Sequence, residues 1–219
     1  MLFQTSRQTG RIPLVLVLGE EGAGKTPFLN LLLKHRVMEG SVVVGPVQTS
    51  VEALKGASYI ALPSVVQGAQ ESCLCCGMHS GLGDVLRKLF FEALKDRSRV
   101  LNRVFIESRE IESGQLAYTL RHTPFLGQRY FHQLTFRLIS ASRLLSEGIH
   151  SLAGLEPESG HDQQMLIISD LITESPKSEG RLLELEPLRA LQTQILRSLP
   201  YRQVLYLDPE TIASELNLV

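Results

Sequence analysis

Hydrophobic and polar positions change between two periods along this chain, and the change predicts strands and helices in turn. Apolar runs of strand length occupy residues 12–18, 41–44, 59–62, 104–106, 134–139, 165–168 and 204–207. Helix-period patterns occupy residues 28–36, 82–94, 114–120 and 188–199. This alternation predicts an α/β fold, with a mostly parallel sheet flanked by helices on both faces and ligands at the carboxyl ends of the strands.

The length and net charge of the chain limit its domain organisation and its possible partners. The chain has 219 residues, 43% of them hydrophobic, so we expect a single domain over residues 1–219, with surface loops at 154–164 and 173–181. Lys and Arg total 22 against 23 Asp and Glu, which predicts neither nucleic acid nor an anionic membrane as a partner. The first residues lack a charged-then-apolar leader, and no apolar run has membrane-spanning length. A cytoplasmic location is expected.

The loop after the first strand has a motif that predicts phosphate binding. Residues 19–26 spell G-E-E-G-A-G-K-T, which fits G-x-x-x-x-G-K-T. Small residues let backbone N–H groups approach phosphates, and the following helix directs its positive dipole end at them. We expect Lys25 to contact the β- and γ-phosphates and the Thr26 hydroxyl to hold Mg²⁺. The alternative is an ordinary strand-to-helix turn.

All three cysteines lie within four residues, in a stretch expected to be a loop just before a helix. Cys73, Cys75 and Cys76 supply thiolates for three of the four positions of a tetrahedral Zn²⁺. The fourth ligand could be His79, water or a partner, although a solvated helix start is the more ordinary role for this histidine. The alternative for the cysteines is a set of small buried apolar side chains. Glu107 ends another strand, where a carboxylate that polarises Mg²⁺ is expected, although an unpartnered surface acid is the alternative.

The order of these motifs resembles the nucleotide domain of the CobW-like GTPases (CobW/HypB/UreG), which couple GTP turnover to delivery of zinc, cobalt or nickel. The phosphate loop, the C-x-C-C cluster at 73–76 and the strand-ending acids Glu107 and Asp170 carry the resemblance, which spans residues 12–208. It implies a P-loop NTPase fold, GTP and Mg²⁺ as ligands, a transition metal on the cysteines and a client metalloprotein. Glu107 would then orient a Mg²⁺-bound water, and Asp170 would accept the guanine N1 and N2 protons. The phosphate-binding residues implied are Gly19, Gly22, Ala23, Gly24, Lys25 and Thr26.

Several positions depart from the family pattern. Pro27 has no N–H for the α-phosphate and is expected to bias Thr26 away from helical angles. Ile168 replaces the lysine of the base-reading Asn/Thr-Lys-x-Asp, and Glu110 replaces the glycine three residues after Glu107. Residues 45–48, Gly-Pro-Val-Gln, replace Asn-Glu-Phe-Gly, and Ser140 replaces an aspartate. The chain also stops near where a second, carboxyl-terminal domain would begin.

Two hypotheses follow from these patterns. The first is a CobW-like GTP-binding protein of the metallochaperone type, with a C-x-C-C transition-metal site and weak NTP hydrolysis. Lys25, Thr26 and Glu107 would be its catalytic residues. The second is a non-catalytic metal-binding or interaction protein on the same fold, whose nucleotide site has decayed. ATP is the alternative nucleotide, because Asp170 alone indicates guanine.

Overall fold

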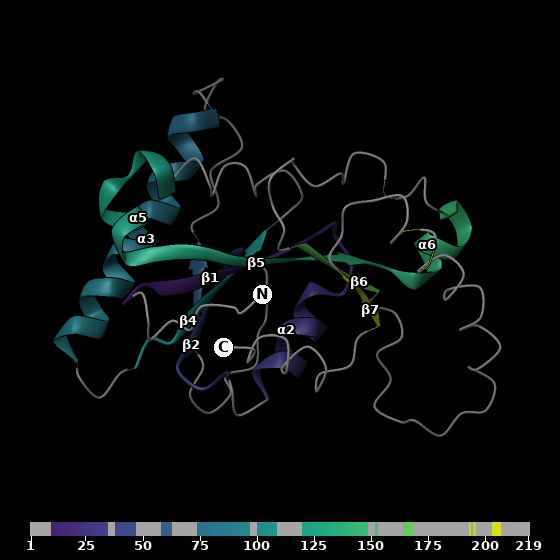
Figure 1. The fold of residues 1–219 in the computed structure, drawn as a ribbon, viewed down its shortest axis with the longest axis horizontal. Helices are drawn as coiled ribbons and strands as arrows, with labels where there is room; N and C mark the ends of the chain where they lie inside the picture. Colours follow the sequence, from purple (N-terminus) through teal and green to yellow (C-terminus); the bar gives the residue numbers. More distant parts are fainter. Residues whose placement is uncertain are drawn as a thin grey trace.

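Seven parallel strands form one sheet in the computed structural model (Figure 1). The structure describes residues 10–34, 38–46, 58–62, 74–96, 100–108, 120–148, 152, 164–168, 193, 195 and 203–206. The strands are β1 (Ile12–Gly19), β2 (Ser41–Pro46), β3 (Ser58–Leu62), β4 (Arg103–Ser108), β5 (Tyr130–Ile139), β6 (Gln164–Ile168) and β7 (Gln203–Tyr206). Their order across the sheet is β3-β2-β4-β1-β5-β6-β7, which places β1 in the middle.

The helices are α2 (Lys25–Leu33), α3 (Leu74–Lys95), α5 (Pro124–Arg129) and α6 (Ala141–Glu147). Every predicted strand is confirmed to within a few residues, and so is the helix expected at 28–36. The helix expected at 82–94 is confirmed, but it begins eight residues earlier than predicted. The short helices α5 and α6 were not predicted. The patterns at 114–120 and 188–199 lie mostly outside the described residues, as do the expected loops at 154–164 and 173–181. Within the described part of the chain, no helix is long and apolar enough to cross a bilayer.

Strand β1 is buried on both faces, which explains its unbroken apolar run. Val15 and Val17 face a core that includes α2, whereas Leu14, Leu16 and Leu18 face a core formed with α3 and α5. All five side chains are at most 1% exposed. A parallel strand covered by helices on both faces reads as a continuous hydrophobic run instead of an alternating one. The predicted α/β fold, with helices on both faces of a parallel sheet, is therefore confirmed (Figure 1).

Aromatic side chains anchor the helices to the sheet. On the α2 face, Phe28 meets Phe136 of β5 edge to face, with ring centroids 5.1 Å apart. On the opposite face, the buried Tyr130 hydroxyl donates a 2.8 Å hydrogen bond to the Leu86 carbonyl of α3. Burial raises the pKa of Tyr130 above its usual range, so this hydroxyl stays a donor. These contacts fix both helical layers against the sheet that carries the site.

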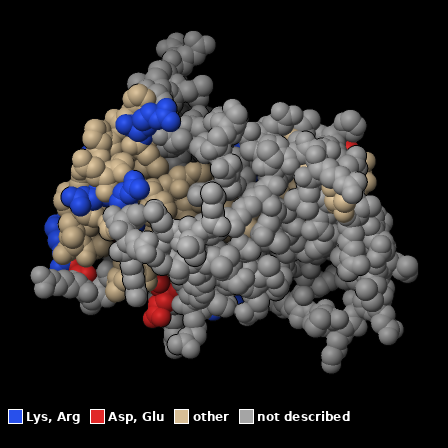
Figure 2. Space-filling view, in the orientation of Figure 1, with Lys and Arg blue, Asp and Glu red and all other residues tan. Residues whose placement is uncertain are grey.

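The outer surface of α3 and α5 combines aromatic rings with guanidinium groups. Arg87 lies 5.9 Å from the ring centre of Phe125, and Arg129 lies 5.1 Å from that of Phe90. Phe91, 45% exposed, stacks on Phe125 with the centroids 5.6 Å apart. Figure 2 shows Lys and Arg side chains over this part of the molecule. Cation–π contacts of this kind let aromatic rings lie at a surface beside cations.

Candidate phosphate and magnesium site

The phosphate loop joins the carboxyl end of β1 to the first residue of α2. Gly22 and Gly24 have φ values of 81° and 80°, and Gly24 is the N-cap of α2. Such left-handed backbone strongly favours glycine. A Cβ on Gly19 would lie 2.9 Å from the Leu138 carbonyl oxygen of β5, so close packing excludes a side chain there as well. Turn geometry and packing thus account for all three glycines of the loop, of which the motif itself requires Gly19 and Gly24.

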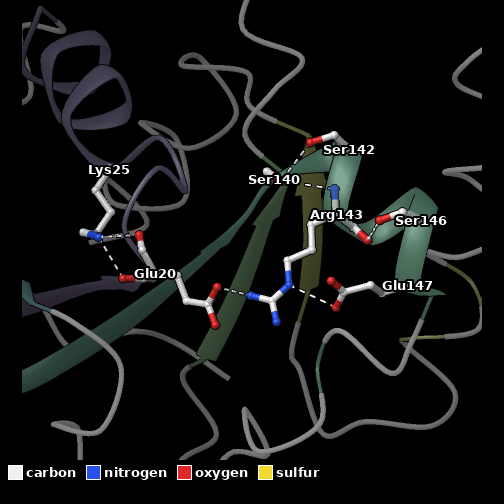
Figure 3. A network of polar contacts seen from close by, with 8 residues as sticks. Glu20, Lys25, Ser140, Ser142, Arg143, Ser146 and Glu147 are labelled. Atoms are coloured by element: carbon white, nitrogen blue, oxygen red, sulfur yellow. Dashed lines mark hydrogen bonds and ion pairs between the residues drawn. The ribbon is translucent and has the colours of Figure 1, made fainter.

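Lys25 folds back over its own loop. Its Nζ donates hydrogen bonds to the carbonyl oxygens of Gly19, at 2.7 Å, and Glu20, at 2.8 Å. The Ala23 amide closes a turn on the same Glu20 oxygen at 3.2 Å. The ammonium group is therefore held beside the loop backbone (Figure 3), which is where the motif predicts that it meets phosphate oxygens.

Thr26 and Pro27 are the second and third residues of α2. The helix closes its first turn with a 3.0 Å hydrogen bond from the Phe28 amide to the Gly24 carbonyl. The expectation that Pro27 would bias Thr26 away from helical geometry is therefore wrong. A first-turn amide has no acceptor within its own helix, so proline costs little there, and closure of the turn outweighs the steric bias on the preceding residue. Pro27 still offers no N–H to a phosphate.

Glu107 lies at the same edge of the sheet as the phosphate loop. It is opposite Val17 in the β1–β4 register, and it is only 4% exposed. A Cβ placed on Gly45 of β2 would lie 3.2 Å from Glu107 Oε2 and 3.0 Å from the Tyr59 hydroxyl of β3. The Glu107 carboxylate and the Tyr59 hydroxyl thus both approach the backbone of Gly45. Sequence reasoning missed Tyr59, because no motif marks it.

The donor set at this edge suits Mg²⁺. A threonine hydroxyl and a carboxylate are hard oxygen ligands, and Mg²⁺ commonly combines one or two such groups with substrate phosphates and water. No group of three or more His, Cys, Asp or Glu side chains among the described residues is arranged to hold a metal by itself. Thr26 and Glu107 therefore fit a magnesium ion that arrives with nucleotide better than a cage made only of protein ligands.

The predicted thiolate site is only partly described. Cys75 and Cys76 lie in the first turn of α3, so the expectation that the whole cluster precedes the helix is wrong for these two residues. Periodic apolar positions begin only at Leu82, so pattern reasoning placed the start of the helix too late. Cys73 lies outside the described residues, as do the side chains of Cys75, Cys76 and His79.

The base-reading residues are also only partly described. Asp170, the expected guanine-reading acid, lies outside the described residues, as does Glu110, which stands at the glycine position after Glu107. Ile168, at the position of the family's lysine, ends β6 with no exposure to solvent. An apolar side chain therefore packs within the core at this position.

Arg143 of α6 joins the phosphate loop through a contact that sequence reasoning missed. Its Nη1 forms an ion pair with the Glu20 carboxylate, and its Nε donates to Glu147 Oε2 at 3.1 Å (Figure 3). These two hydrogen bonds raise the pKa of Arg143 further above its ordinary value. Only the spacing between Arg143 and Glu147, one helical turn, was readable from the sequence, and it says nothing of Glu20.

The sequence that forms this site matches one known protein family. The family model for the CobW/HypB/UreG nucleotide-binding domain matches residues 13–175. The chain belongs to the CobW/HypB/UreG family. For this CobW/HypB/UreG member, the match takes in the phosphate loop, the cysteine cluster and both strand-ending acids. No curated protein matches the sequence.

Three solved structures are similar to this CobW/HypB/UreG chain. HypB from Helicobacter pylori in complex with nickel is 15% identical, with a TM-score of 0.52 over 97% of this chain and 88% of that one. Zn(II)-bound YjiA GTPase from E. coli is 16% identical, with a TM-score of 0.48 over 90% of this chain. PAB0955 of Pyrococcus abyssi, a GTPase in apo form, is 16% identical, with a TM-score of 0.38 over 93% of this chain and 94% of that one. The chain spans 57% of the length of YjiA. The likeness to HypB supports the P-loop fold.

Proposed function

We propose that this chain is a GTP-binding protein of the metallochaperone type, with weak NTP hydrolysis and a transition-metal site at Cys73, Cys75 and Cys76. The observation that carries the proposal is the phosphate loop. Lys25 is bonded to the carbonyls of Gly19 and Glu20, at the sheet edge that also carries Glu107. Membership of the CobW/HypB/UreG family supports GTP as the nucleotide, with Asp170 as the guanine-reading acid.

The residues of the loop would act by binding and orienting the triphosphate. Backbone N–H groups at the start of α2 and the Lys25 ammonium would stabilise charge on the transferring phosphoryl group. Thr26 and Glu107 would hold Mg²⁺, which supplies charge neutralisation when bound, and Glu107 would orient the attacking water. Turnover is expected to be slow, because Pro27 donates no N–H and Glu110 stands where the family has a mobile glycine.

The cysteine cluster would bind Zn²⁺ or another transition metal. Thiolates are the preferred ligands for soft and borderline ions, and helix N-termini lower thiol pKa values. HypB of H. pylori was solved with nickel and YjiA of E. coli with zinc, which supports a metal as the second ligand. Delivery of that metal to a client metalloprotein is part of the proposal.

The test compares the wild type with Lys25→Ala, using Lys88→Ala as the matched control, because Lys88 is 78% exposed on α3. GTP binding is measured by calorimetry and phosphate release by a steady-state assay, with Zn²⁺ and Mg²⁺ present. We expect Lys25→Ala to abolish measurable binding and release while Zn²⁺ affinity, measured without nucleotide, is unchanged, and Lys88→Ala to behave as the wild type. Absence of GTP and ATP binding by the wild type at millimolar nucleotide would refute the proposal.

Pro27 favours one alternative, a metal-binding protein whose nucleotide site has decayed. In that case the wild type and Lys25→Ala share the same background rate of phosphate release, while both bind Zn²⁺ equally. A competition experiment between GTP and ATP separates the proposed nucleotide from its alternative.

A further inference from the structure

The phosphate loop carries its own acidic residues next to the place where a triphosphate is proposed to bind. Glu20 and Glu21 follow directly after Gly19. A nucleoside triphosphate is strongly anionic, so an uncompensated carboxylate in the loop opposes its approach. If the loop binds a triphosphate, as the proposed function requires, the fold must offset this negative charge.

Glu20 lies between two cations that come from different elements. Its carbonyl oxygen accepts a hydrogen bond from Lys25 Nζ at 2.8 Å, and its carboxylate forms an ion pair with Arg143 (Figure 3). The backbone of the residue is thus bonded to the cation of the P-loop, while its charge is bonded to a cation of α6. Glu20 therefore links the phosphate loop to a helix more than a hundred positions later in the chain.

Arg143 is held by its own helix in the position that this contact needs. Its backbone amide donates to the Ser140 hydroxyl at 3.2 Å, and its carbonyl accepts from the Ser146 hydroxyl at 3.0 Å. Its Nε donates to Glu147 Oε2 at 3.1 Å, one turn along α6. The side chain of Arg143 is 34% exposed and that of Glu20 is 51% exposed, so solvent partly screens this ion pair and its effect on affinity is modest. Hydrogen bonds to the two carboxylates also favour the charged form of the guanidinium.

We propose that Arg143 is a positioning residue of the phosphate loop: by neutralising the Glu20 carboxylate it lets an acidic loop accept an anionic ligand, and the same ion pair tethers the nucleotide-free loop to α6. Arg143 acts through Glu20 and touches no part of the nucleotide in this scheme. Two consequences follow. Removing Arg143 weakens phosphate binding, and removing the Glu20 charge makes Arg143 dispensable for that binding.

The experiment is a double-mutant cycle on the whole chain, with GTP and Mg²⁺ as the probe at low ionic strength. Arg143→Gln is expected to weaken GTP binding by about three- to tenfold, less at high salt because screening removes the repulsion. Glu20→Gln is expected to bind at least as tightly as the wild type. The double variant Glu20→Gln/Arg143→Gln is expected to return close to the wild-type affinity.

Two controls separate this role from a merely structural one. Arg143→Lys keeps the charge and should retain most of the affinity. Glu147→Gln removes the other carboxylate bonded to Arg143 and leaves the loop contact in place, so it should bind GTP as the wild type does. An Arg143 that only stabilised α6 would give a loss of affinity that Glu20→Gln does not restore, and that result would overturn the inference. An unchanged affinity in Arg143→Gln would do the same.

A second measurement keeps the inference distinct from the proposed function. Amide hydrogen exchange in the nucleotide-free protein is compared over residues 20–28, because the lost ion pair should speed exchange there in Arg143→Gln and not in Glu147→Gln. If the wild type bound no nucleotide, the proposed function would fail, and unchanged exchange in Arg143→Gln would then refute the tether as well. Faster exchange would uphold the tether on its own.

Discussion

At the scale of single residues, Gly45 sets the space around the acid of the site. Gly45→Ala would bring a methyl group to 3.0 Å from the Tyr59 hydroxyl and 3.2 Å from Glu107 Oε2. Because one of these polar groups must give way, we expect the carboxylate to shift and Mg²⁺-dependent GTP binding to weaken by about tenfold or less, in line with the loss of roughly one good interaction. Calorimetry with and without Mg²⁺ measures the effect.

Gly83→Ala is the matched control for this change. Its new methyl group would lie 3.7 Å from the nearest atom, Leu126 Cδ1, which is an ordinary contact. Gly83 lies inside α3, so alanine should leave stability unchanged or raise it by about 0.5–1 kcal/mol. If both variants bound GTP equally in the presence of Mg²⁺, Gly45 would have no role in positioning Glu107.

Pro27 offers a gain-of-function test. Pro27→Ala restores a backbone N–H at the third position of α2, where the family pattern donates to the α-phosphate. A hydrogen bond to a charged group contributes on the order of 1.5–3 kcal/mol, so GTP binding should tighten by about tenfold to a hundredfold. The measurement is GTP affinity by calorimetry, with Pro124→Ala as a control in the first turn of α5. Equal affinity in Pro27→Ala and the wild type would mean that this amide position makes no phosphate contact.

At the scale of elements, α6 depends on its cap. Ser140 precedes the helix and accepts a hydrogen bond from the Arg143 amide at 3.2 Å. Ser140→Ala should cost about 1 kcal/mol of stability, which is typical for the loss of a serine cap. Thermal denaturation measures this cost, and Leu145→Ala, at a 42% exposed position of the same helix, is the control. Amide exchange in α6 should rise only in the first variant, and equal exchange would show that the cap is dispensable.

The long strands were predicted from the sequence, but the short helices α5 and α6 were not. The strands were predicted well because burial on both faces gives long apolar runs, as in β1. Helices α5 and α6 are 6 and 7 residues long, too short for a 3.6-residue period to repeat. Pro124 at the start of α5 and Ser140 before α6 were the usable signals, since proline and serine favour these helix positions. α3 begins earlier than predicted because its first turns, with Cys75 and Cys76, have no apolar period.

The phosphate loop could be predicted from the sequence, whereas the contact of Arg143 with that loop could not. The loop was readable because its glycines, lysine and threonine are adjacent in the chain and each is required by local geometry. The ion pair of Arg143 with Glu20 joins residues 123 positions apart. Long-range pairs of this kind depend on strand order, which local patterns do not specify. The approach of Tyr59 and Glu107 to Gly45 has the same origin, because three separate strands bring them together.

At the scale of the whole molecule, the proposed nucleotide and metal sites are expected to be linked. The phosphate loop follows β1, and the cysteine cluster overlaps the start of α3, which packs on one face of that strand. If GTP with Mg²⁺ changes Zn²⁺ affinity by some factor, Zn²⁺ must change GTP affinity by the same factor, typically about 5- to 150-fold for coupled sites. Titrating each ligand in the absence and presence of the other measures both factors. Two independent affinities would show that the sites do not communicate.

The place of β1 in the sheet bears on how a newly made chain reaches this structure. Ile12–Gly19 is synthesised before both of the strands that it pairs with, Arg103–Ser108 and Tyr130–Ile139. Pairings so distant in sequence form slowly, because a long stretch of chain must first be brought together. The strand that presents the phosphate loop therefore stays unpaired and apolar until Arg103–Ser108 and Tyr130–Ile139 have been synthesised. Over that interval it is a natural target for chaperones that recognise extended hydrophobic segments.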